Sequence, residues 1–135
     1  MTHDHVNFKL RENLRMTMTV QRLHVAKRFS EIAISGNLVH LAGQLASDFS
    51  SDIKGQTQQT LDIIDQFLAD AGTDKSHIMS VTIYLKDIDK DYDAFNEIWD
   101  AWVSDIEALP RACGEAKMYH PNVLVGMTVV AVKPE

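Results

Sequence analysis

Residues 123–132, VLVGMTVVAV, constrain the fold more than any other stretch of this sequence. The run is too short to cross a membrane as a helix, which takes about 20 apolar residues. Read as a strand, it places successive side chains on opposite faces of a sheet, and here both sets are apolar. The strand should therefore be buried on both sides, with helices covering one face. In a chain of 135 residues the simplest cover for the other face is a second copy of the chain.

The remaining patterns predict one domain over residues 1–135, without a Pro/Gly/Ser-rich linker. Gly36-Asn37 joins two β-rich runs and predicts a hairpin over 31–43. Apolar residues at three- and four-residue steps predict helices over 56–71, ended by Gly72, and 92–106. Strands are expected at 6–10, 17–25, 77–85, 111–119 and 123–132, with 1–16 as an N-terminal arm or edge strand. This order predicts an α+β fold, a mixed sheet with both helices packed on one face.

Composition narrows the classes of function and the compartment. A net charge of −6 without a basic stripe argues against nucleic acid as a partner. The single cysteine cannot form an internal disulfide, and the six histidines form no metal-binding motif, so no metal site is expected. The chain begins without the basic-then-apolar pattern of a secretory signal. We therefore expect a cytoplasmic protein with no membrane contact.

The stretch ALPRACGEA, residues 108–116, holds the candidate chemistry. On a strand, Arg111, Cys113 and Glu115 share one face with Lys117 and Tyr119. Such a row is most often a solvated strand face. Arg111 stands at the start of the strand, however, where its guanidinium could bind a carboxylate through two parallel hydrogen bonds. Cys113 is more often a small buried residue than a nucleophile, and no histidine is placed to activate it.

Four stretches in order resemble the YjgF family, also called the reactive intermediate deaminase family, over residues 20–132. They are RFSEIAISGNLVHLAGQLASD, DIKGQTQQTLDIIDQFLADAGTDKSHIMSVTIYLKDI, FNEIWDAWV and PRACGEAKMYHPNVLVGMTVVAV. The resemblance implies a chorismate-mutase-like fold and a homotrimer with clefts between subunits. It also implies cofactor-free hydrolysis of reactive 2-enamino and 2-imino acids, such as 2-aminoacrylate, to 2-keto acids and ammonia.

The resemblance also assigns expected roles to residues. Arg111 matches the arginine that binds the substrate carboxylate. The positions expected to line the cleft are Phe29, Ser30, Gly43, Asn96 and Cys113, while Arg28 belongs to this branch without an assigned role.

One departure from the family pattern bears on catalysis. Gly126 stands where many active members carry a glutamate that positions water. Three alternatives follow: Arg111 suffices together with a water held by backbone carbonyls, or Glu31 or Glu115 replaces the glutamate, or the protein is a non-catalytic trimer that binds small carboxylate metabolites. A ribonuclease or translation inhibitor, a label some members carry, fits the acidic composition poorly.

Overall fold

The computed structural model describes residues 7, 9–11 and 19–135. Residues 7 and 9–11 are helical, so the strand expected over 6–10 is wrong where the chain is described. Leu10 is exposed, and a short alternation of apolar and polar residues marks a strand only when one side is covered. The rest of the expected arm, and the start of the β-rich stretch from residue 17, lie outside the described residues.

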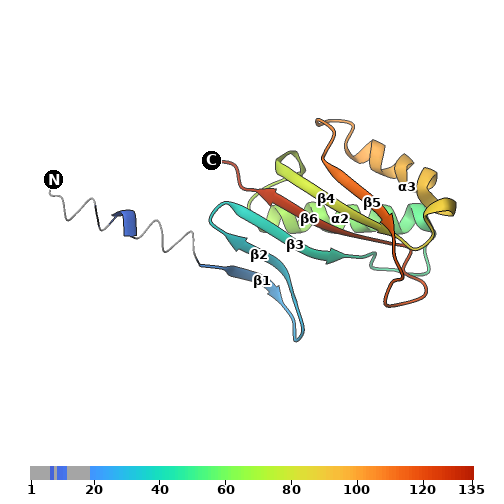
Figure 1. The fold of residues 1–135 in the computed structure, drawn as a ribbon, viewed down its shortest axis with the longest axis horizontal. Coiled ribbons are helices and arrows are strands. Elements are labelled where there is room, and N and C mark those ends of the chain that lie inside the picture. Colours follow the sequence, from blue (N-terminus) through green and yellow to red (C-terminus); the bar gives the residue numbers. More distant parts are fainter. Residues whose placement is uncertain (1–6, 8, 12–18) are drawn as a thin grey trace.

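Within the described residues, six strands form one mixed sheet (Figure 1). They are β1 (Gln21–Val25), β2 (Ser30–Ser35), β3 (Leu38–Gln44), β4 (Ile78–Leu85), β5 (Arg111–Glu115) and β6 (Val125–Val132). Their order across the sheet is β1-β2-β3-β6-β4-β5, and only β4 and β5 run parallel. The predicted α+β fold with a mixed sheet is confirmed.

Two helices cover one face of this sheet. Helix α2 (Ile53–Asp70) packs on β3 and β6, and α3 (Ile88–Trp102) packs on β4, with a short 3₁₀ turn at Lys75–His77 before β4. Both helices begin before the residues at which the apolar pattern starts. The reason is capping: the Asp52 carboxylate accepts a hydrogen bond from Gly55 N at 2.8 Å, and Asp87 accepts one from Lys90 N at 3.1 Å.

The central strand β6 is buried along its helix side, whereas its opposite side is buried only at Gly126. Val125, Met127, Val129 and Ala131 lie in the core with Leu61, Ile64 and Phe95. On the other face Thr128, Val130 and Val132 are partly exposed, and Tyr84 beside them is exposed. Among residues 19–135 this second face remains partly exposed, and its cover by a second copy is a proposal.

Turns and irregularities set the positions of the strand ends. The predicted hairpin is confirmed: Ser35 pairs with Leu38, and Gly36 takes a left-handed φ of 60°. Gly72 ends α2 with a φ of 85°. The register between β3 and β6 shifts between Leu41 and Gln44, which the sequence patterns did not predict. Neither α2 nor α3 is long and apolar enough to span a bilayer.

Candidate active site

Arg111 is the first residue of β5, and its place in the sheet directs its side chain. In the parallel register Val81 pairs with Arg111, Ile83 with Cys113 and Leu85 with Glu115. Since Val81, Ile83 and Leu85 are core residues beneath the helices, their three partners point to the same side. The strand was expected to run to residue 119, but it ends at Glu115 because β4 ends at the paired Leu85. Lys117 and Tyr119 therefore lie outside the strand and do not share a face with Arg111.

The Arg111 guanidinium packs against α3. Its Nη2 atom donates hydrogen bonds to Asn96 Oδ1 at 2.9 Å and to the Tyr92 hydroxyl at 3.3 Å. Its Cζ atom lies 5.1 Å from the Trp99 ring centroid and 5.8 Å from that of Phe95, within the range of cation–π attraction. Arg111 and Asn96, both predicted from the sequence, are therefore direct neighbours.

Among residues 19–135, no side chain neutralises the charge of Arg111. Within the described parts of the chain, no carboxylate forms an ion pair with it. Its Nη1 atom is buried and has no hydrogen-bond acceptor. A buried donor without an acceptor costs free energy, more so on a charged group. The arrangement therefore favours an anionic ligand that supplies the missing acceptor.

Cys113 and Glu115 follow Arg111 on the same strand and point to the same side of the sheet. Burial raises the pKa of the Cys113 thiol, and the nearby charge of Arg111 offsets part of that effect. A raised pKa keeps the group as a thiol near neutral pH, which disfavours a nucleophilic role. Glu115 Oε1 accepts a hydrogen bond from Ile88 N at 3.2 Å, in the first turn of α3. Between this turn and Cys113 lies a cavity of about 480 Å³, lined also by Asp89, Tyr92 and Asp93.

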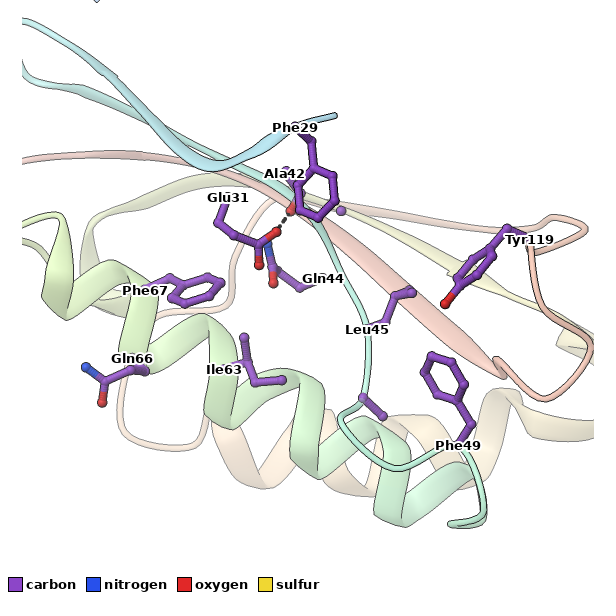
Figure 2. Close-up of a pocket in the computed structure, with 12 residues that line it drawn as sticks. Phe29, Glu31, Ala42, Gln44, Leu45, Phe49, Ile63, Gln66, Phe67 and Tyr119 are labelled. Atoms are coloured by element: carbon purple, nitrogen blue, oxygen red, sulfur yellow. Dashed lines mark hydrogen bonds between the residues drawn. The ribbon is translucent and has the colours of Figure 1, made fainter. Parts of the chain in front are cut away.

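A larger pocket, of about 660 Å³, lies beside β2 and β3, in the half of the sheet away from β5 (Figure 2). Residues from β2 and β3, from α2, and from the loops after β3 and β5 form its walls. The lining residues are Phe29, Glu31, Ala42, Gly43, Gln44, Leu45, Ala46, Phe49, Ile63, Gln66, Phe67 and Tyr119. We refer to it below as the aromatic pocket.

Sequence reasoning found three residues of this pocket and missed the others. Phe29, Gly43 and Glu31 were predicted as site residues. Phe67 and Ile63 lie in the helix predicted over 56–71, among its apolar residues, and both are only partly buried. That incomplete burial could be recognised only once the sheet was placed. The aromatic side chains of Phe49 and Tyr119 come from loops, where no periodic pattern indicates them.

Three further predicted residues lie beside the aromatic pocket. Ser30 is partly buried and pairs with Val25, while Arg28 is exposed in the β1–β2 turn, which Ala26 N closes by bonding to Phe29 O at 2.8 Å. Gly126 pairs with Tyr84 and is buried. A Cβ atom at Gly126 would lie 3.1 Å from Leu45 Cδ2, so Leu45 occupies the space a larger residue would need.

One chain does not bring all of the predicted site residues together. Arg111, Asn96 and Cys113 lie at the β5 edge, whereas Phe29, Glu31 and Gly43 lie on β2 and β3 or beside them. Strands β6 and β4 stand between β3 and β5, so three strand spacings separate the two groups, about 14 Å. A small metabolite cannot contact both groups of the same chain. The described residues contain no cluster of three or more His, Cys, Asp or Glu placed to hold a metal ion.

Comparison with known proteins identifies the family. The family model described as endoribonuclease L-PSP matches residues 19–133. The chain also superposes on the crystal structure of a member of the YjgF protein family from Neisseria meningitidis, with a TM-score of 0.83 and 34% identity, covering 88% of this chain and 98% of that one. This chain belongs to the YjgF family.

This YjgF-family protein aligns with nearly the whole length of its curated relatives. A RutC family protein from Haemophilus ducreyi is 43% identical over 112 residues, 83% of this chain and 95% of the relative. The RutC family protein YoaB of Escherichia coli K12 is 34% identical over 114 residues, 84% and 98% of the two chains. An uncharacterised Pseudomonas aeruginosa protein, 40% identical, superposes with a TM-score of 0.82 over 86% of this chain and all of that one. The predicted family is thus confirmed.

Proposed function

We propose that this YjgF-family protein hydrolyses reactive 2-enamino and 2-imino acids to 2-keto acids and ammonia, with Arg111 binding the substrate carboxylate. The observation that carries this proposal is the state of the Arg111 guanidinium. Asn96 and the two aromatic rings hold it in place, no described carboxylate neutralises it, and Nη1 lacks an acceptor. A carboxylate ligand would supply both the charge and the acceptor.

The proposed chemistry asks little else of the protein. A protonated imine is already electrophilic at C2, so catalysis requires orientation of the substrate, a placed water and a group that moves protons. Binding through the carboxylate leaves C2 one bond away from the anchored group. The apolar walls of the aromatic pocket would then receive the substrate side chain.

We also propose that the complete site forms between copies of the chain, in a homotrimer. Two observations support this assembly. The Arg111 group and the aromatic pocket are about 14 Å apart within one chain, by strand spacing. The face of β6 that carries Val130 is also partly exposed among the described residues. An arrangement that covers this face with a neighbour could bring Arg111 of one copy to the aromatic pocket of the next.

An oxidase-coupled assay tests the proposed reaction. An amino-acid oxidase generates the imino acid, semicarbazide traps it, and a deaminase lowers the amount of semicarbazone formed. Wild-type protein should lower it, and Arg111→Ala should lose about 10- to 150-fold in kcat/KM, the range for a hydrogen bond to a charged group. Lys90→Ala, which removes an exposed cation from α3, is the matched control and should retain full activity. An Arg111→Ala rate equal to wild type would remove Arg111 from this role.

The second candidate function is a non-catalytic trimer that binds small carboxylates. Gly126 favours it, because no carboxylate stands at that position and Leu45 fills the adjacent space. In this case a 2-keto acid such as pyruvate would raise the melting temperature by mass action, without any turnover of imines. Introducing Gly126→Glu needs Leu45→Ala beside it to relieve the 3.1 Å contact. Turnover gained only in the double variant would favour lost catalysis in the natural protein.

A further inference from the structure

We propose that Glu31 is the group that carries protons during imine hydrolysis in this protein, in place of a carboxylate at position 126. This inference rests on the proposed function and names a further catalytic residue for it. It can fail while the proposed function stands, since Arg111 could bind the substrate whether or not Glu31 moves protons.

The position of Glu31 is the first step of the argument. Its side chain lies in the wall of the aromatic pocket, and Figure 2 shows the carboxylate directed into the pocket beside Gln44 and Phe67. It is the only charged side chain among the residues that line the pocket. Glu31 is only partly buried, so its carboxylate can reach a water or a ligand in the pocket.

Within the described part of the chain, the Glu31 carboxylate is also free of protein partners and can therefore exchange a proton with water or substrate. Among residues 19–135 it has neither an ion-pair partner nor a hydrogen-bond donor. The nearest candidate partner along β1 is His24, which lies between the paired residues Leu23 and Val25. Its ring instead stacks on Phe67, with centroids 5.0 Å apart, and Nε2 lies 2.9 Å from Asp70 Oδ2. His24 is therefore engaged with α2 and leaves Glu31 unpaired.

The alternative carboxylate has another task. Glu115 stands two residues beyond Cys113, on the strand of Arg111, but its Oε1 atom accepts the backbone N–H of Ile88. A carboxylate near the N-terminus of a helix stabilises that end of the helix. Protonating Glu115 during a reaction would weaken this contact in every catalytic cycle. Of the two substitutes that the sequence allows, Glu31 fits the task better.

The reaction balances with Glu31 as the only proton carrier. The oxygen of a water adds to C2 of the iminium acid as the C=N π pair moves to nitrogen, and Glu31 takes a proton from that water. Glu31 then returns the proton to the amine nitrogen. The C–N bond breaks, a lone pair on the hydroxyl oxygen forms the C=O bond, and the hydroxyl proton leaves with ammonia as ammonium. Iminium acid and water thus give 2-keto acid and ammonium.

Glu31→Gln tests the proposal, because the amide preserves shape but cannot accept the proton. General acid–base catalysis contributes about 10²- to 10⁴-fold, so kcat should fall by about 100-fold or more while KM changes little. Glu31→Asp should restore part of the rate. The exposed Glu107 provides the matched control, and Glu107→Gln should retain wild-type turnover. Glu115→Gln should lower the melting temperature while keeping most of kcat.

The pH dependence separates proton transfer from a structural role. If Glu31 carries the proton, wild-type kcat should decline toward acid pH, and Glu31→Gln should lack this decline. The other titratable groups nearby are Tyr119 in the pocket wall and the His24–Asp70 pair beside Phe67. His24→Gln should therefore keep the acid decline. Wild-type activity with unchanged kcat in Glu31→Gln would overturn this inference alone, whereas a wild type without any activity would overturn the proposed function as well.

Discussion

At the scale of single residues, the molecule positions Arg111 through neutral groups. A carboxylate partner in the protein would compete with the substrate for the guanidinium, whereas the Asn96 amide and the Trp99 ring orient it without cancelling its charge. Such orientation reduces the conformational freedom that ligand binding would otherwise have to remove. Asn96 is thus expected to act through Arg111 rather than on the substrate.

Asn96→Ala should raise KM more than it lowers kcat. The variant leaves Nη2 with only the longer contact to Tyr92, so the guanidinium is less well fixed when the carboxylate arrives. Loss of a hydrogen bond to a charged group corresponds to about a 10-fold or larger effect. Steady-state kinetics in the imine assay measure the two constants separately. Tyr92→Phe should have a smaller effect, and an unchanged KM in Asn96→Ala would show that Asn96 does not position Arg111.

The Cys113 thiol should make the stability of the folded protein depend on pH. Burial raises the pKa of its thiol above the ordinary value of 9.0, so the folded protein retains this proton to higher pH than the unfolded chain. The stabilising contribution is complete below about pH 9 and is lost as the pH rises through the folded-state pKa. Melting temperatures measured from pH 8 to 10.5 should therefore fall more steeply for wild type than for Cys113→Ala. Parallel curves would mean that burial does not shift the thiol.

At the scale of elements, α3 connects the fold to the site, because it carries both Tyr92 and Asn96. Its start was not predicted correctly from the sequence: the apolar stripe suggested residue 92, whereas the helix begins at Ile88. Asp87 caps the helix one turn before the stripe begins, and a method based on apolar spacing does not detect a polar cap. The same reason accounts for the early start of α2 at Ile53, after Asp52.

Asp87→Ala should destabilise the protein by about 1 kcal/mol, the usual cost of a lost helix cap, and lower the melting temperature by about 4 °C. Because α3 holds the partners of Arg111, KM should rise as well. Asp52→Ala, at the equivalent position of α2, should cost similar stability without changing KM. Calorimetry and kinetics on both variants test this, and equal KM changes in the two would contradict a specific role for α3.

Some elements were predictable because their determinants are local. The Gly36-Asn37 turn predicted the β2–β3 hairpin, and Gly72 predicted the end of α2. The contact between Arg111 and Asn96 depends on the parallel register of β5 with β4, which no local pattern determines. The aromatic pocket depends on the bulge between Leu41 and Gln44 and on two loops. Long-range register and loop conformation are therefore what the sequence reasoning could not supply.

At the scale of the whole molecule, the sheet face opposite the helices is the surface on which the proposed assembly depends. Val130, which pairs with His40 and Ser80 across the middle of this face, is partly exposed. A charge placed there would remain in water in a monomer but would be buried in the proposed trimer, at high cost.

Val130→Glu should therefore yield a particle of lower mass than wild type and reduce imine hydrolysis with it. Light scattering coupled to gel filtration measures the mass. Ala69→Glu, on the exposed side of α2, adds the same charge outside the proposed interface and should leave the trimer intact. A wild-type particle of one chain that is fully active would contradict the proposed assembly.

The most direct test of a shared site is complementation between two impaired variants. Arg111→Ala removes the carboxylate anchor, and Ile63→Trp enlarges a side chain of α2 that lines the aromatic pocket of its own chain. The Arg111→Ala homotrimer should retain about a tenth of wild-type activity at most, and the pocket variant should retain less. Equimolar co-assembly should restore about a quarter of the sites, those with an intact Arg111 from one copy and an intact pocket from its neighbour. Recovery near that level is the result we expect. If the mixture is no more active than its two components, Arg111 and the aromatic pocket do not form one site between subunits.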